Sequence, residues 1–113
     1  MIKKADLYKK ILEFLLWIQE DPSLKHPSLK EFTDGMKLLI EGVSADVEIW
    51  MDWEKLTPDE IPVEDAFDVF KSFLQHWIQK KGLNLFDEIL YKFDPDDFDY
   101  SEKMVQKWES LLK

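Results

Sequence analysis

Apolar residues recur three or four positions apart along most of this 113-residue chain, and this spacing constrains its fold more than any other feature. Residues at that spacing lie on one face of an α-helix. A first run begins after Asp6 and ends before Asp21. Its members are Leu7, Ile11, Phe14, Leu15 and Ile18. We therefore predict an amphipathic helix in this part of the chain.

A second helix is predicted from a start signal and another stripe. Ser28 and Glu31 have the spacing of a capping box, in which each side chain accepts a hydrogen bond from a free backbone N–H of the first turn. The apolar residues behind this signal are Leu29, Phe32, Met36, Leu39, Ile40 and Val43. Gly42 is the predicted stop.

A third long helix is predicted to begin near Pro62. Thr57, followed by proline, is a further start signal before it, because proline is favoured at the first helical position. The stripe of the long helix contains Val63, Phe67, Phe70, Leu74, Trp77 and Ile78. Two lysines and Gly82 follow, and they predict a cationic last turn and a stop.

Two more helices complete the expected fold. Asn84 is placed to cap one that runs to about Lys92, with Leu85, Phe86, Ile89 and Leu90 as its apolar residues. Asp99 and Glu102 predict the start of the last, whose inward residues are Met104, Val105, Trp108, Leu111 and Leu112. The sequence contains no repeat and no Gly/Ser linker. We therefore expect one compact all-α domain of five to seven helices over residues 1–113.

Residues 46–54 fit two structures, a short strand or an irregular helix. Apolar and polar side chains nearly alternate there, as in a half-buried strand, but a lone strand would leave backbone groups unpaired. As a helix the segment has two apolar stripes, Val47, Trp50 and Met51 on one side and Ile49, Trp53 and Leu56 on the other. We favour the helix. We expect Trp53 rather than Trp50 to face solvent, because its stripe lies beside Asp46 and Asp52.

The formal net charge is −9, and the acids concentrate in two segments. The first acidic segment (residues 46–68) has nine acids against Lys55 alone, and the second (residues 94–102) has five acids and no base. Acids around exposed aromatic side chains attract a basic partner and speed its association. The residues that we expect to contact such a partner are Asp46, Glu48, Trp50, Asp52, Trp53, Glu54, Asp59, Glu60, Asp94, Asp96, Asp97 and Asp99.

Catalytic, metal and phosphate chemistry find little support in the sequence. There is no cysteine, and we interpret the two histidines as an exposed loop residue, His26, and a half-buried residue at a helix border, His76. Asp94 and Asp96 resemble the start of an EF-hand loop, but the residues at its fifth, sixth and twelfth positions do not fit. Three scattered glycines form no phosphate cradle. We expect no catalytic residue, metal site or cofactor, and hence no enzyme.

The composition favours a binding function. All fifteen cations are lysine, and the absence of arginine disfavours direct nucleic-acid binding. Small size and acidic charge fit a bacterial immunity protein or antitoxin that neutralises a cationic, nuclease-type toxin by stoichiometric binding. One alternative is a nucleic-acid mimic of the anti-restriction or anti-CRISPR type. Another is a structural or adaptor domain that self-associates, for example as a homodimer. The apolar run near the N-terminus is too short to span a bilayer, so we expect a cytoplasmic protein without membrane contact.

Overall fold

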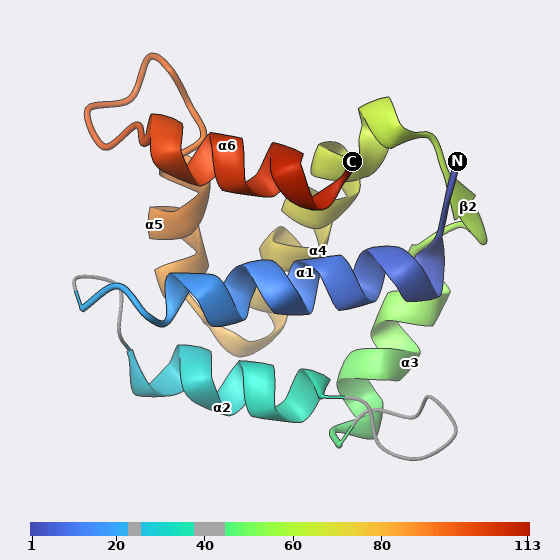
Figure 1. Ribbon diagram of the computed structural model, residues 1–113. Helices are drawn as coiled ribbons and strands as arrows, with labels where there is room; N and C mark the ends of the chain where they lie inside the picture. Colours follow the sequence, from blue (N-terminus) through green and yellow to red (C-terminus); the bar gives the residue numbers. More distant parts are fainter. Residues whose placement is uncertain (23–25, 38–44) are drawn as a thin grey trace. The chain divides into compact units, whose positions relative to one another are not determined.

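The computed structural model describes residues 1–22, 26–37 and 45–113, and these residues form six α-helices, one 3-10 helix and two strands of two residues each (Figure 1). The prediction of an all-α fold with five to seven helices is confirmed. The described residues divide into two compact units, Met1–Ala66 and Phe67–Lys113. The expectation of one domain over residues 1–113 stays a prediction.

Helix α1 (Lys4–Ile18) supplies the core of the first unit along the predicted stripe. Its buried residues are Leu7, Tyr8, Ile11, Phe14, Leu15 and Ile18. Of these, only Tyr8 was not part of the predicted stripe. Its hydroxyl donates a hydrogen bond of 2.8 Å to the carbonyl oxygen of Met36, so the polar tip of the side chain is satisfied inside the core. Met36 is the last residue of α2 (Pro27–Met36), which lies beside α1 in Figure 1.

Helix α2 is capped by His26 rather than by Ser28. The imidazole Nδ1 of His26 accepts a hydrogen bond of 3.1 Å from the backbone N–H of Ser28. Pro27 occupies the first helical position, where no N–H is needed. The capping box predicted at Ser28 is therefore wrong, because the imidazole already supplies the acceptor for the first turn. The predicted stripe residues Leu29, Phe32 and Met36 are buried. The predicted stripe residues Leu39, Ile40 and Val43 and the predicted stop Gly42 lie outside the described residues.

Residues 47–54 belong to a helix, α3 (Val47–Leu56), as we favoured, and not to a strand. Asp46 caps it, since its carboxylate accepts a hydrogen bond of 3.0 Å from the backbone N–H of Glu48. The start of α3 lies close to Gly35 of α2, whose carbonyl oxygen accepts the N–H of Asp46 at 2.9 Å. A Cβ atom on Gly35 would lie 3.0 Å from the Cδ1 atom of Ile49. The glycine therefore permits the close approach of α2 and α3.

Trp53 faces the core of the first unit, so the expectation that it faces solvent is wrong. Its side chain is 0% exposed, whereas Trp50 is half-buried. The indole Nε1 of Trp53 donates a hydrogen bond of 3.0 Å to the carbonyl oxygen of Lys4, and its ring lies 5.8 Å from that of Tyr8. The neighbouring acids, Asp46 and Asp52, therefore do not determine which side of α3 faces the solvent. Burial of a large ring with its N–H satisfied stabilises this side of α3 as the inner one.

Two short strands join the start of the chain to the residues after α3. Strand β1 (Ile2–Lys3) pairs antiparallel with β2 (Glu60–Ile61). The backbone N–H of Lys4 extends this pairing with a bond of 3.1 Å to the carbonyl oxygen of Asp59. The helix start predicted at Thr57 is therefore wrong. Thr57 is the C-cap residue of α3, and the backbone after it is drawn into the pairing with β1.

Helix α4 (Ala66–Lys81) follows a 3-10 turn, η2 (Val63–Asp65), and confirms the predicted third long helix. Val63, predicted on the buried side, lies in η2 with 44% of its surface exposed. Gly82 ends the helix as predicted. Its φ is +67°, a left-handed conformation that glycine adopts without strain, and its N–H donates to the carbonyl oxygen of Ile78 at 2.9 Å.

The last two helices were predicted, but both caps differ. Asn84 stands at the N-cap position of α5 (Leu85–Tyr91), yet its side chain makes no capping hydrogen bond there. Helix α6 (Glu102–Leu111) is capped by Ser101, whose hydroxyl accepts a hydrogen bond of 3.3 Å from the backbone N–H three residues later. The cap predicted at Asp99 is wrong, because the helix begins at Glu102 and Ser101 occupies the N-cap position, two residues after Asp99.

The core of the second unit is aromatic. Phe70 of α4 and Trp108 of α6 stack with ring centroids 4.6 Å apart. Phe67 lies 4.8 Å from Phe93, which follows α5, and 6.4 Å from Trp108. The predicted inward positions Phe70 and Trp108 are thus the residues through which α4 and α6 pack.

Candidate partner-binding surfaces

The predicted contact residues fall into two groups, one in each unit. Those of the first unit are Asp46, Glu48, Trp50, Asp52, Trp53 and Glu54 on α3 or its cap, and Asp59 and Glu60 between α3 and the end of β2. Those of the second unit are Asp94, Asp96, Asp97 and Asp99, in the loop between α5 and α6. No carboxylate of either acidic segment is buried. Both surfaces therefore present negative charge to solvent.

The side of α3 opposite its buried residues is apolar, and we call it the outer face of α3, defined by Val47, Trp50, Met51 and Glu54. Val47 is 52% exposed and Met51 is 60% exposed, and Glu54 is also exposed. At about 100° per residue, positions 47, 51 and 54 lie on one side of the helix and position 50 at its border. Neither Val47 nor Met51 was among the predicted contact residues, because the sequence could not show which stripe faces solvent.

Trp50 is held in place at the border of the outer face. Its ring meets that of Tyr8 edge to face, with centroids 4.9 Å apart and an interplanar angle of 89°. This geometry is one of the favourable arrangements of two aromatic rings. Tyr8 is itself buried and fixed through its hydroxyl. The indole of Trp50 therefore has a defined position while part of it remains open to solvent.

The acids of α3 have unequal roles. Asp46 is the N-cap residue, so its carboxylate stabilises the helix start. Glu48 and Asp52 are half-buried and lie four residues apart, between the outer face and the buried side. Glu54 lies within the outer face. Trp53 is fully buried and cannot contact a partner on this surface, so its inclusion among the contact residues is corrected.

Lys4 offsets part of the charge at the end of α3. Its Nζ atom lies 3.1 Å from a carboxylate oxygen of Asp59 and 3.9 Å from one of Glu54. The Asp59 side chain is 93% exposed, so solvent screens the pair and its contribution to stability is below about 1 kcal/mol. Glu60 lies opposite Lys3 in the strand pair. Lys3 and Lys4 therefore offset part of the negative charge between the end of α3 and β2.

The second surface is a loop ordered by its own backbone. The carboxylates of Asp94 and Asp97 accept hydrogen bonds of 2.9 and 2.8 Å from the N–H groups of Asp96 and Asp99. These are Asx turns, which fix the path of the chain. Phe98 is fully exposed within them. Phe98 was not among the predicted contact residues, because the sequence around an aromatic residue in an acidic turn does not indicate whether its side chain is buried.

No constellation for metal binding exists among residues 1–22, 26–37 and 45–113: no group of three or more histidine, aspartate or glutamate side chains is placed to hold an ion. Of the histidines, His26 is exposed and His76 half-buried against Trp77, as we interpreted them. The carboxyl group of Asp34 on α2 has a lowered pKa. Hydrogen bonds from the Lys30 ammonium group first, and from Lys37 second, hold the pKa of Asp34 below its ordinary value. It lies on neither surface.

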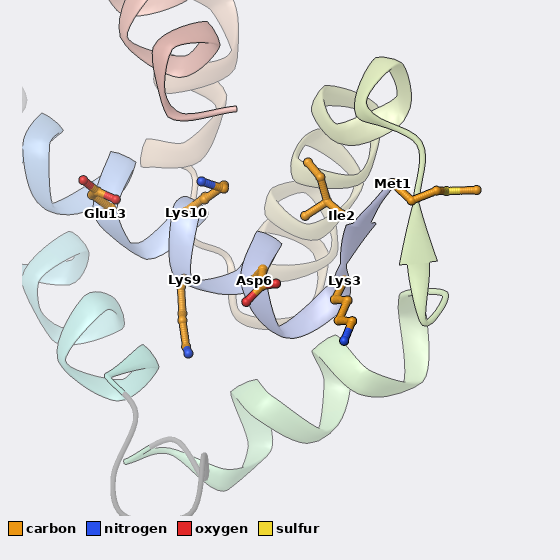
Figure 2. Close-up of a pocket in the computed structure, with 7 residues that line it drawn as sticks. All are labelled: Met1, Ile2, Lys3, Asp6, Lys9, Lys10 and Glu13. Carbon is orange, nitrogen blue, oxygen red and sulfur yellow. The ribbon is translucent and has the colours of Figure 1, made fainter. Parts of the chain in front are cut away.

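An open depression lies along the exposed side of β1 and α1 (Figure 2). Its lining residues are Met1, Ile2, Lys3, Asp6, Lys9, Lys10 and Glu13. Figure 2 shows Lys9 and Lys10 extending from α1 in different directions, with acids along the same helix. Lysines and acids are both present, and their side chains do not point to a common centre. The depression therefore does not form a binding site for a ligand of either charge.

Comparisons with protein-family models, curated proteins and solved structures found no match to this chain. Within the part of the chain that the structure describes, no helix combines the length and apolarity required to cross a bilayer.

Proposed function

We propose that this protein is a stoichiometric inhibitor that binds a basic protein, in the manner of an immunity protein or antitoxin acting on a cationic, nuclease-type toxin. The observation that carries this proposal is the placement of the two acidic segments: none of their carboxylates is buried. The proposal assigns the chain a binding role and no catalytic step.

Exposed charge of one sign acts mainly on association. A negative surface raises the local concentration of a cationic partner and orients it before contact, which can increase the association rate by about 10- to 1000-fold at low ionic strength. This steering weakens as salt is added, because the Debye length falls to about 8 Å at physiological ionic strength. The proposal therefore predicts fast, strongly salt-dependent association.

Capture of the partner at low salt is the first experiment. The tagged chain retains proteins from its native source at low ionic strength, and a salt gradient elutes them. A bound protein of high pI whose activity falls in proportion to added chain, ending at equimolar ratio, supports the proposal. Capture that is abolished by duplex DNA at equal charge would instead favour a nucleic-acid mimic. A partner that is neutral or acidic would contradict the proposal.

Neutralisation of three carboxylates then tests the first acidic segment with the purified partner. A variant with Glu48→Gln, Asp52→Asn and Glu60→Gln keeps side-chain shape and removes three charges from the first acidic segment. The control carries Glu13→Gln, Glu20→Gln and Glu109→Gln, which change net charge equally elsewhere. We expect the first variant to associate at least about threefold more slowly, with a smaller salt dependence, than the control. Equal rates for the two variants would show that only net charge matters.

A further inference from the structure

We infer that the outer face of α3 is a docking surface for an amphipathic segment of the basic partner, one that presents an apolar stripe beside lysine or arginine side chains. The inference rests on the proposed function, since it takes the partner to be basic. It adds the place of contact and the chemistry of the segment that occupies it.

The exposed apolar side chains of α3 are not needed for its packing. Ile49 and Trp53 bury the inner side, with 3% and 0% of their surfaces exposed. Val47 and Met51 stand four residues apart on the opposite side and remain more than half exposed. Isolated exposed apolar residues are normal on protein surfaces. Two that adjoin each other and a half-buried tryptophan form a continuous apolar stripe, which an apolar partner can cover.

The stripe combines a fixed anchor with an adaptable one. Tyr8 orients the ring of Trp50 before any partner arrives, so little side-chain entropy is lost on binding. Met51 is unbranched and polarisable, and such side chains adjust to the shape of an apposed surface. Tryptophan is also among the residues enriched at the energetic centres of interfaces.

The charge of the helix selects the occupant. Glu48, Asp52 and Glu54 accompany the stripe, and Lys55 is the one basic residue of α3. A second copy of this chain docked face to face would bring the same acids against one another, which is unfavourable. A segment with apolar residues at helical spacing and cations on its flanks complements both features, as in the groove-binding mode of amphipathic helices.

Two synthetic peptides serve as the probe. Both contain only leucine and lysine, with identical composition and length. In one, leucines recur every three or four residues, and in the other the order is scrambled to abolish the stripe. Binding to the full chain is measured by titration, and the indole N–H signal of Trp50 is followed by NMR. We expect the amphipathic peptide to bind at least about tenfold more tightly than the scrambled one and to shift that signal.

Removal of the stripe tests the site itself. The double variant Val47→Gln with Met51→Gln leaves every charge unchanged, and glutamine has a helix propensity no lower than that of valine, so α3 is retained. We expect this variant to bind the amphipathic peptide at least about tenfold more weakly. The control is Leu16→Gln, at a residue of α1 that is 36% exposed, and it should bind as the unaltered chain does. Unchanged thermal unfolding of all three chains shows that the fold is kept.

The outcomes separate this inference from the proposed function. Equal binding of the two peptides, failure of both to bind, or unchanged binding by the double variant would overturn the docking surface. Salt-dependent capture of a basic partner would still stand in that case. Sedimentation that shows a dimer broken by the double variant would also overturn the inference, because the occupant would then be a second copy.

Discussion

Replacement of Trp53 by phenylalanine tests the orientation of α3. The Trp53 ring is fully buried and its indole N–H donates to the carbonyl oxygen of Lys4 at 3.0 Å. Phenylalanine removes that hydrogen bond, a loss of about 1 kcal/mol. It also leaves part of the indole volume unfilled, which costs about 1–2 kcal/mol in a core that relaxes only partly. We expect Trp53→Phe to lower the free energy of unfolding by about 2–3 kcal/mol.

The matched change is Trp50→Phe on the same helix. Trp50 is half-buried, and phenylalanine can keep the edge contact with Tyr8, so we expect a loss below about 1 kcal/mol. Urea unfolding and thermal unfolding, both followed by far-UV circular dichroism, are the assays, because removal of either tryptophan alters fluorescence. Thermal midpoints should fall by roughly 8–12 °C for Trp53→Phe and by less than about 4 °C for Trp50→Phe. A loss for Trp50→Phe equal to or above that for Trp53→Phe would refute the inward placement of Trp53.

Three further predictions concern caps and one charged cluster. His26→Ala removes the acceptor at the start of α2 and should lower the free energy of unfolding by about 1 kcal/mol, measured by thermal unfolding. Gly82→Ala places a side chain at φ +67° and should also cost about 1 kcal/mol, measured by urea unfolding. The lowered pKa of Asp34 means that its ion pairs stabilise the fold above the carboxyl group's unfolded-state pKa, and that this contribution is lost as pH falls through the lower folded pKa. An NMR titration should place the midpoint of Asp34 below 3.8, and the double change Lys30→Met with Lys37→Met should raise it.

Each of these has a matched control. His26→Asn retains a side-chain acceptor and should keep most of the stability, so equal losses for the two changes would argue against a capping role. Gly82→Asn should be tolerated better than Gly82→Ala, because asparagine enters the left-handed region more readily. A midpoint of Asp34 that does not respond to loss of both lysines would show that they do not cause the shift.

The existence of the helices could be predicted from sequence because apolar period is a local property. The stripes predicted from Leu7 and from Val63 extend over several turns. The structure has α1 at the first place, and at the second it has α4, which begins at Ala66, three residues after Val63. The role of Gly82 was also predictable, because two lysines directly before a glycine are a local signal for the end of a helix.

The features that were missed depend on residues far away in the sequence. Periodicity gave α3 two stripes, but Lys4 and Tyr8 on α1 determine which of them is buried. Strands β1 and β2 have two residues each, too few to show a period, and they exist only as a pair. The cap of α2 differs from the predicted one because the imidazole of His26 lies where its Nδ1 accepts the N–H of Ser28, and histidine is not among the residues favoured at this position.

The candidate surfaces were partly predictable for the same reason. Clusters of acids in sequence become exposed carboxylates almost wherever they fall, because burial of an unpaired charge is costly. Their use could not be predicted, and Asp46 is occupied as a helix cap. The apolar part of the outer face depends on the orientation of α3. Val47 and Met51 are surface residues because Trp53, on the other side of the helix, is the one that is buried.

The hydrogen bond between Trp53 and Lys4 joins residues 49 positions apart, and this separation has a consequence for synthesis of the chain. A ribosome adds about 5–20 residues per second, so Trp53 is made roughly 2–10 s after Lys4. During that interval the inner side of α1 has been translated without the helix that covers part of it. The rate of translation between α1 and α3 therefore sets how long this apolar side of α1 stays without its cover.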